Sequence, residues 1–389
     1  MKFITSLNPQ NKKVLLRVDY NIDLDEKRRI VNDFRIRASL PTIKFLLDKN
    51  AKKIIIVSHL GRPKGRDKKL SLAPIAENLQ KLLKQKVVFI DDCIGERVKN
   101  EIEKNEKDKI FVLENTRFYS EEEKNDKNFA KKLAELAEVY VNDAFGVSHR
   151  LNASVAAIVN FLPSYGGLLL QKEIINLSHL KEKAERPFTV ILGGAKISDK
   201  LPTINKFLNI ADYILIGGGL ANTIWKAWGF NVGKSLVEKE KIVEAKMLGS
   251  KNAELILPGD FLVAPSFKAK KGVERQIGKI KNNEIIVDIG PIAIQTFCKL
   301  INAAKTILWN GPMGYWENKA FREGTKKIAE AIAKNKNFTV VGGGETLIAI
   351  EELKLSENYS FVSTGGGAML EFLAGNNLPA IALLEKNNL

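Results

Sequence analysis

Short runs of β-branched and other apolar residues recur along the chain, separated by segments with helical periodicity. Five runs lie in the first half and six in the second: residues 14–18, 53–57, 87–90, 110–113, 139–141, 188–192, 213–216, 255–257, 306–309, 338–341 and 361–363. This alternation of strand and helix predicts parallel sheets that are covered by helices on both faces. So many strands exceed what one open sheet usually holds. The pattern therefore favours an α/β chain with two doubly wound, Rossmann-like parallel sheets.

Breaks in the pattern indicate where one domain ends and the next begins. At roughly 150 residues per domain, the 389 residues suggest two domains. Pro163 and Gly166-Gly167 interrupt the pattern, and an amphipathic segment, 168–184, separates them from Pro187 and the next strand. We therefore expect a first domain over 1–165, an interdomain helix or hinge over 166–186 and a second domain over 187–371.

Features of secreted and membrane proteins are sparse in the sequence. The first residues lack the apolar stretch of a signal peptide. An uncharged window, 151–171, is long enough to span a membrane, but Pro163 and several Asn, Ser and Gly residues interrupt it. We expect a buried helix, a turn and the start of another helix there. Cys93 and Cys298 are too few for a disulfide framework, so we expect a cytoplasmic protein.

The charge balance is basic, with 61 lysines and arginines against 45 aspartates and glutamates, a formal net charge of +16. A basic total is typical of nucleic-acid-binding proteins. However, the lysines are scattered along the chain, and no aromatic RNA-binding signature accompanies them. We therefore favour a lysine-rich surface. A basic nucleic-acid-binding protein on the same scaffold is kept as the alternative function.

Polar and cationic residues follow the strands of the first half. Since ligands of open parallel sheets bind at the carboxyl ends of the strands, these residues are expected to share one site. Arg35 follows Asp33, an expected N-cap, and a cation in the first turn of a helix opposes the helix dipole unless an anion lies nearby. A small, highly anionic ligand would explain this cluster, whereas surface exposure or local acidic partners would explain each arginine singly. The strand-end candidates are Asp19, Asn21, His59, Arg62, Arg117, His149 and Arg150.

Glycine follows most strands of the second half. Glycine lets the backbone approach a ligand closely, and a following helix offers free N–H groups to phosphate; tight turns between packed elements are the other explanation. Lys196 and Lys200, four residues apart, are expected to share one face at the start of a helix and to hold an anion. Glu317 and Glu345 could help to bind Mg²⁺ that accompanies a nucleotide. These features together predict a two-lobed phosphotransferase whose lobes close to exclude water. The glycine-containing ends lie at 193–194, 217–219, 311, 342–344 and 365–367.

Six motifs resemble those of phosphoglycerate kinase, in order and at the expected spacing. They lie at residues 17–21 (RVDYN), 58–63 (SHLGRP), 142–146 (NDAFG), 193–196 (GGAK), 309–314 (WNGPMG) and 363–367 (STGGG). The resemblance implies the glycolytic reaction, in which 1,3-bisphosphoglycerate and MgADP reversibly give 3-phosphoglycerate and MgATP. It also implies Mg²⁺ with ATP or ADP, hinge closure, a monomer, and a C-terminal tail of about residues 372–389 packed on the first domain. No general base is needed, because the acceptor carboxylate is already ionised.

The same resemblance implies roles for individual residues. It places 3-phosphoglycerate among Asp19, Asn21, Arg35, His59, Arg62, Arg117 and Arg150. It places the nucleotide against Lys196, Lys200, Gly217, Gly218, Asn310, Pro312, Glu317, Gly343, Gly344, Glu345 and Thr346. Gly365 and Gly366 would support the transferring phosphate. Arg35 and Lys196 would stabilise its charge during transfer, and Glu345 would meet Mg²⁺.

Three positions depart from the family's usual pattern. Glu345 stands where the family usually has Asp, Asn152 where it commonly has a second histidine, and Ile286 where it usually has Gly beside the adenine pocket. A different acyl-phosphate kinase on the same fold is a second alternative function.

Overall fold

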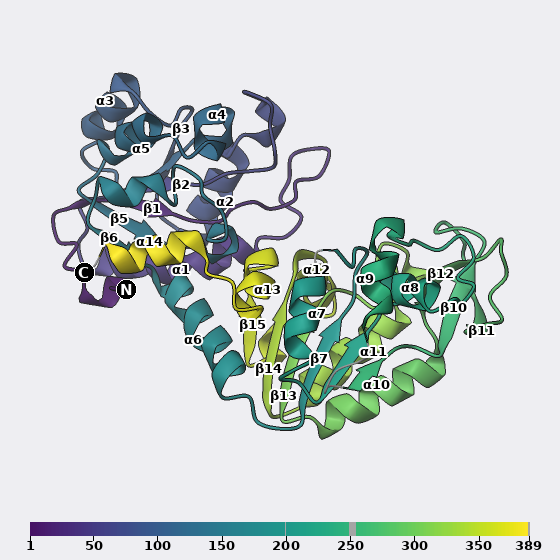
Figure 1. Cartoon of the computed structure of the whole chain (residues 1–389). Helices are drawn as coiled ribbons and strands as arrows, with labels where there is room; N and C mark the ends of the chain where they lie inside the picture. Colours follow the sequence, from purple (N-terminus) through teal and green to yellow (C-terminus); the bar gives the residue numbers. More distant parts are fainter. Residues whose placement is uncertain (199, 249–253, 388–389) are drawn as a thin grey trace. The chain divides into compact units, whose positions relative to one another are not determined.

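The computed structural model describes residues 1–198, 200–248 and 254–387 (Figure 1). The chain divides into two compact units, which we describe separately. Unit 1 consists of Met1–Ile175 together with Asn377–Leu389, and unit 2 consists of Asn176–Asn376. Unit 1 is therefore discontinuous in the sequence.

Unit 1 is built on a six-stranded parallel sheet with the order β3-β4-β2-β1-β5-β6. Every residue of β2, β4 and β5 is buried, and so is β1 after its first residue, as expected for a sheet covered on both faces. The strands are β1 Lys13–Arg17, β2 Lys53–Val57, β3 Val87–Ile90, β4 Ile110–Leu113, β5 Val139–Asn142 and β6 Ser164–Gly166.

Helices connect the strands of unit 1 and cover its sheet. In α2, for example, Ile75, Ala76 and Leu79 recur at helical spacing and are buried. The helices are α1 Phe34–Asp48, α2 Ala73–Leu83, α3 Glu96–Lys104, α4 Ser120–Glu123, α5 Lys127–Ala134 and the C-terminal α14 Pro379–Lys386. A further helix, α6 Leu168–Glu182, follows β6 and continues past the boundary between the units.

Unit 2 contains a second six-stranded parallel sheet, with the order β15-β14-β13-β7-β8-β9. β7 and β13 at its centre are buried throughout. The strands are β7 Phe188–Leu192, β8 Tyr213–Ile216, β9 Glu254–Ile256, β13 Thr306–Asn310, β14 Phe338–Gly342 and β15 Phe361–Ser363. The helices are α7 Leu201–Phe207, α8 Gly218–Ala227, α9 Ile242–Lys246, α10 Pro291–Ala303, α11 Glu323–Lys334, α12 Gly344–Glu352 and α13 Gly367–Leu373. The predicted fold class, two parallel α/β sheets, is confirmed.

An additional three-stranded sheet in unit 2 departs from the predicted alternation. Its strands, β10 Asp260–Ala264, β11 Val273–Gln276 and β12 Ile285–Ile289, pair antiparallel in the order β11-β10-β12. The outer strand β11 is mostly exposed and carries Glu274 and Arg275, so it lacks the apolar run of a buried strand. The expectation of strand–helix alternation throughout the chain was wrong for this segment.

The uncharged window 151–171 also differs from expectation. In place of a buried helix and a turn it forms a short 3₁₀ helix, Ala157–Asn160, and then the edge strand β6, before α6 begins. β6 pairs with β5 over only three residues, too short a run to be recognised from its sequence. Within the part of the chain that the structure describes, no helix is both long and apolar enough to cross a membrane.

The C-terminal helix α14, yellow in Figure 1, packs in unit 1 against β6. Ala380 belongs to a small buried cluster with Ala144, Val147 and Val155, and its N–H donates to the carbonyl of Ser148 at 3.1 Å. Leu384 is completely buried. The last described helix therefore completes the unit in which the chain begins.

Candidate functional site

The carboxyl end of β1 in unit 1 holds an arginine–carboxylate pair. Asp19 is 8% exposed, and its Oδ2 accepts a hydrogen bond of 2.7 Å from Nη1 of Arg35. The same nitrogen donates to the backbone oxygen of Asn21 at 3.1 Å. Arg35 lies in the first turn of α1, as predicted. The anion beside this unusually placed cation is therefore Asp19, which holds the guanidinium at the sheet edge.

His59, which follows β2, is buried beside the same pair. Its Nδ1 lies 3.3 Å from Nη2 of Arg17 and 3.9 Å from Oδ1 of Asp19. A guanidinium can only donate, so Nδ1 accepts and the ring proton resides on Nε2. Burial and then the charges of Arg17 and Arg117, with further cations nearby, hold the pKa of His59 well below its usual value. His59 is thus a neutral hydrogen-bonding group and not a cation at pH 7.

The remaining predicted residues of unit 1 surround the loop after β2. The Gly61 N–H donates to Oδ1 of Asn21 at 2.8 Å, and Nη1 of Arg117 donates to the Gly61 carbonyl at 2.7 Å. Burial and the charge of Arg150 lower the pKa of Arg117. Arg62 follows Gly61 and is exposed. The structure thus joins Asn21 and Arg117 through one loop, with Arg62 beside it.

Arg150, further along the chain, contacts its neighbour His149. Its Nε lies 3.1 Å from Nε2 of the imidazole. Burial and then the charge of Arg150 lower the pKa of His149, although Asp19 opposes this effect. Both histidines near this edge are therefore uncharged at neutral pH, and the arginines supply its positive charge.

A buried charged network behind this edge escaped sequence reasoning. Arg17 is 1% exposed; its Nε donates to Oγ of Ser154 at 2.8 Å, and its Nη2 lies 4.0 Å from Oε1 of Glu122. Oγ of Ser154 also donates to Glu122 at 2.6 Å. Glu122 belongs to the acidic run 121–123, which reads as the polar start of a helix. Glu122 is only 1% exposed, and nothing in the neighbouring sequence predicts that this carboxylate is buried.

The glycine turns of unit 2 pack against one another at the carboxyl ends of β7, β8 and β13. A Cβ at Gly193 would lie 2.0 Å from the Pro312 carbonyl oxygen, and one at Gly219 would lie 2.4 Å from that of Ala195. Tight packing therefore explains these glycines, as the alternative interpretation held. In contrast, Cβ atoms at Gly344 and Gly366 would meet nothing within 4 Å among the described residues.

Lys196 and Lys200 do not share a helical face, so that expectation was wrong. Helix α7 begins only at Leu201, and Lys196 lies in the preceding loop, where it is exposed. Lys200 is 9% exposed and folds back onto the strand ends. Its ammonium donates to the carbonyls of Gly193 and, at 3.0 Å, Asn310. Lys200 is therefore buried against the strand ends, whereas Lys196 is exposed.

A cavity of about 450 Å³ opens beside these turns, within unit 2. Apolar side chains form much of its wall, among them Leu236, Phe267, Ile286 and Val287. The predicted nucleotide residues that line it are Gly218, Pro312, Glu317 and Glu345. Those that do not are Lys196, Lys200, Gly217, Asn310, Gly343, Gly344 and Thr346, and neither Gly365 nor Gly366, which were predicted to support the transferring phosphate, lines it.

Some predicted residues that do not line the cavity hydrogen-bond to the turns beside it or begin neighbouring helices. Oγ1 of Thr346 accepts a hydrogen bond of 2.7 Å from the N–H of Gly311. Gly217, Gly343 and Gly366 are the N-cap residues of α8, α12 and α13. Free N–H groups of helix starts are suited to anions. The edge of this sheet therefore combines an apolar cavity with several helix N-termini.

A cation–π contact in the cavity wall was also missed. The guanidinium of Arg322 lies 4.3 Å from the ring centroid of Trp316, and its Nη1 donates to Oε2 of Glu352 at 2.6 Å. Asp288 lines the same cavity, and burial raises its pKa to about 7. Arg322 follows Trp316 by six residues in a segment without helical or strand periodicity, so their contact has no pattern that predicts it.

The cavity offers carboxylate oxygens to a divalent cation but no complete metal cage. Glu317, Glu345 and Glu352 all line it. No group of three or more His, Cys, Asp or Glu residues in the described ranges is arranged to hold a metal ion by itself. These residues fit Mg²⁺ that arrives with phosphates and keeps phosphate and water ligands.

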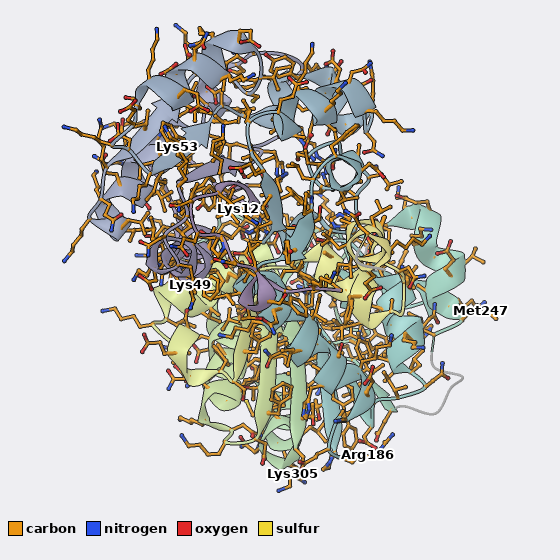
Figure 2. The ribbon with its side chains drawn as sticks, turned by 90° about the vertical axis from the view of Figure 1, so that its left-hand side faces the viewer. Lys12, Lys49, Lys53, Arg186, Met247 and Lys305 are labelled. Atoms are coloured by element: carbon orange, nitrogen blue, oxygen red, sulfur yellow. The ribbon has the colours of Figure 1, made fainter. Side chains whose placement is uncertain are left out.

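Basic residues outside these sites occur in both units. The basic side chains labelled in Figure 2 belong to both units: Lys12, Lys49 and Lys53 to unit 1, and Arg186 and Lys305 to unit 2. Lys53 is buried and donates to the carbonyl of Asn105 at 3.1 Å, a structural role.

Comparisons with known proteins agree over nearly the whole chain. A family model described as phosphoglycerate kinase matches residues 4–376. A phosphoglycerate kinase from Dictyoglomus turgidum is 48% identical over 97% of this chain and 96% of that protein. One from Coprothermobacter proteolyticus is 45% identical over 99% and 98%.

Solved structures show the same similarity. A phosphoglycerate kinase from Pyrococcus horikoshii superposes with a TM-score of 0.90 at 31% identity, covering 100% of this chain and 99% of that chain. One from Coxiella burnetii superposes with a TM-score of 0.82 at 38% identity, covering 98% of each chain. None of these matches supports the nucleic-acid-binding alternative.

Proposed function

Because the chain belongs to the phosphoglycerate kinase family, and is thus a phosphotransferase, we propose that it transfers a phosphoryl group reversibly between 1,3-bisphosphoglycerate and MgADP. Unit 1 would bind the phosphoglycerate and unit 2 the nucleotide. The contrast between the two sheet edges carries this assignment of substrates. One edge presents arginines with neutral histidines, whereas the other presents an apolar cavity beside helix N-termini.

Arginine side chains are the groups that unit 1 would use to hold the small substrate. Arg35, Arg62, Arg117 and Arg150 supply positive charge for its phosphate and carboxylate groups. Nε2 of His59 carries the ring proton and is a neutral donor. Asp19 keeps Arg35 in place through the 2.7 Å hydrogen bond. Asn21 would complete this site through its contact with the loop after β2.

Unit 2 would hold the nucleotide with its base in the apolar cavity and its phosphates near the glycine turns. The helix starts at Gly217, Gly343 and Gly366 offer N–H groups to phosphate oxygens. Mg²⁺ supplies charge neutralisation for these phosphates, and Glu345 is the carboxylate we assign to it. Glu317 would face the sugar, and Lys200 would fix the strand ends.

The transfer itself needs alignment and charge stabilisation but no general base. An oxygen of the ADP β-phosphate attacks the phosphorus of the acyl phosphate, and the bond between that phosphorus and the carboxyl oxygen breaks. The electron pair stays on the leaving carboxylate, and no proton is transferred. We assign Arg35 and Lys196 to the charge on the phosphoryl group in flight. Since the donor and acceptor bind to different units, the units must approach each other for transfer.

We also propose that the enzyme works as a monomer in the cytoplasm. The resemblance to the family supports the monomer. Cys93 and Cys298 are both free thiols, which fits a reducing compartment.

The decisive experiment is acyl-phosphate formation from MgATP and 3-phosphoglycerate, trapped with hydroxylamine. The unmodified protein should turn over, whereas Arg35→Ala and Lys196→Ala should each lose on the order of 10³-fold or more in kcat. Arg37→Ala is the matched control, because Arg37 lies on the same helix, is 43% exposed and pairs with Asp33 at 2.7 Å. It should keep nearly full activity.

Other outcomes separate the parts of this proposal. Activity that survives both substitutions would contradict the roles of Arg35 and Lys196 while leaving the reaction in place. Turnover with acetate but not with 3-phosphoglycerate would support the second alternative, another acyl-phosphate kinase.

A further inference from the structure

The cavity of unit 2 contains an amide whose hydrogen-bonding capacity is unmet. Asn222 lines the cavity and is only 3% exposed. Its Oδ1 is buried and has no hydrogen-bond partner among the residues that the structure describes. Buried amide oxygens are nearly always paired in folded proteins. An unpaired one in the wall of a ligand cavity favours a second orientation of the amide, in which Oδ1 faces the cavity and a ligand supplies the donor.

The position of Asn222 along α8 relates it to the phosphate end of the cavity. It follows Gly218 by four residues and Gly219 by three, so the three residues share one face of the helix. All three line the cavity. Asn222 is therefore about one helical turn, roughly 5 Å, along α8 from the end where phosphate would bind.

The apolar residues of the cavity indicate which part of a nucleotide Asn222 would meet. Leu236, Ile286 and Val287 suit the flat face of a purine. Glu317, a charged residue of the wall, is the one proposed above to face the sugar. Helix α8 packs against β12, the strand that contains Ile286 and Val287. Asn222 thus belongs to the base end of the cavity.

Building on the nucleotide role proposed above, we propose that Asn222 reads the base by accepting a hydrogen bond from the exocyclic amine at position 6 of adenine. Because Oδ1 is buried in the recorded orientation, this contact requires rotation of the amide about its Cβ–Cγ bond, which exchanges the positions of Oδ1 and Nδ2. Guanine and hypoxanthine carry a carbonyl oxygen at position 6, which would oppose Oδ1 with a second acceptor. If the amide turned Nδ2 toward that carbonyl, Oδ1 would remain buried and unpaired. The 6-amino base is therefore favoured.

Calorimetric titration of the full chain with three nucleoside diphosphates tests this role without turnover. The ligands are ADP, IDP with a 6-oxo group, and purine riboside diphosphate with only hydrogen at position 6. The unmodified protein should bind ADP about tenfold more tightly than either analogue, the effect of one buried hydrogen bond. In Asn222→Leu the advantage of ADP over purine riboside diphosphate should fall to about twofold or less.

Two further variants separate base reading from packing. Asn222→Asp keeps an acceptor and should still favour ADP over IDP, whatever its overall affinity. Asn205→Leu makes the same apolar change at an exposed position of α7 that does not line the cavity, and it should keep the wild-type ratios. Equal binding of all three ligands by the unmodified protein, or an unchanged ratio in Asn222→Leu, would overturn the role of Asn222. If the unmodified protein bound none of the three ligands, the proposed nucleotide role of unit 2 itself would be contradicted.

Discussion

Gly311 is constrained both by its backbone and by its surroundings. Its φ is +95°, in the region that favours glycine. A Cβ would lie 2.4 Å from the carbonyl oxygen of Gly193 and 2.6 Å from Nζ of Lys200. The carbonyls of Gly193 and Asn310 hold the Lys200 ammonium next to Gly311. Any side chain at position 311 therefore displaces the ammonium.

We therefore expect Gly311→Ala to weaken ADP binding at least tenfold and to destabilise unit 2 by about 1–3 kcal/mol. Calorimetry measures the affinity. Tryptophan fluorescence in urea reports unit 2 alone, because all 4 tryptophans lie within residues 225–316. Gly259→Ala is the control, since its Cβ would meet nothing within 4 Å. Wild-type ADP affinity in a folded Gly311→Ala protein would contradict the proposed importance of the Lys200 position.

At the residue scale, the sequence predicts which side chains stand at strand ends but not which ones they touch. Asp19 and His59 could be placed at one edge because parallel strands end together. The Arg17–Ser154 hydrogen bond joins residues 137 positions apart, and nothing in either segment specifies it. Similarly, Asn222 reads as an ordinary helical residue until the cavity beside it is known.

Helix α6 begins on a buried carboxylate contributed by another element. Oδ1 of Asp143, just after β5, accepts hydrogen bonds from the N–H groups of Leu169 at 2.9 Å and Leu170 at 3.1 Å. A Cβ at Gly167 would lie 2.2 Å from that oxygen, so glycine is required for this approach. Burial raises the pKa of Asp143 to about 6 from 3.8, although a hydrogen bond with the Thr42 side chain and then these two backbone hydrogen bonds oppose the shift.

The raised pKa of Asp143 makes stability depend on pH with a definite sign. Between pH 3.8 and about 6 the native state holds a proton that the unfolded chain has lost, so the contribution of Asp143 to stability falls as pH rises. Asp143→Asn cannot titrate. The free energy of unfolding of the variant minus that of the wild type should increase by about 2 kcal/mol from pH 4 to pH 7. Urea unfolding followed by circular dichroism measures it, and a difference that does not change with pH would refute the prediction.

At the element scale, the sequence predicts the buried parallel strands most reliably. β2, β3 and β7 occupy the predicted residues because each is rich in β-branched and other apolar residues. β11 could not be predicted in this way, because its residues are mostly exposed. The helix expected to contain Lys196 begins only at Leu201, and the N–H groups of Lys200 and Leu201 both donate to the Ile197 carbonyl at 2.9 Å.

The discontinuity of unit 1 leads to a prediction for the whole molecule. Leu384 of α14 is completely buried in unit 1, although the chain reaches it only after unit 2. Leu384→Ala should destabilise unit 1 by about 2–4 kcal/mol through the lost packing. Its neighbour Leu383 is only half-buried, so Leu383→Ala is the matched control and should cost less.

Two optical signals distinguish the units in this experiment. Circular dichroism should show earlier unfolding of part of the Leu384→Ala protein, while the tryptophan signal from unit 2 should keep its urea midpoint. A shift of the tryptophan midpoint with no change in the unfolding of unit 1 would contradict the placement of α14.

At the scale of the whole molecule, chain length and the alternation of strands and helices predict two parallel sheets. The position of α14 in unit 1 depends on its packing against β6. Neither segment carries a sequence periodicity that would predict this contact.

The interruption of unit 1 by unit 2 also has a consequence for biosynthesis. A ribosome releases residues in order, so all of the segment 176–376 leaves the exit tunnel before α14 does. Unit 2, whose residues are contiguous, can therefore finish folding while unit 1 still lacks its last helix. Until α14 emerges, the apolar surface that Leu384 covers stays open to chaperones. Emergence of α14 is thereby coupled to completion of the unit whose synthesis began first.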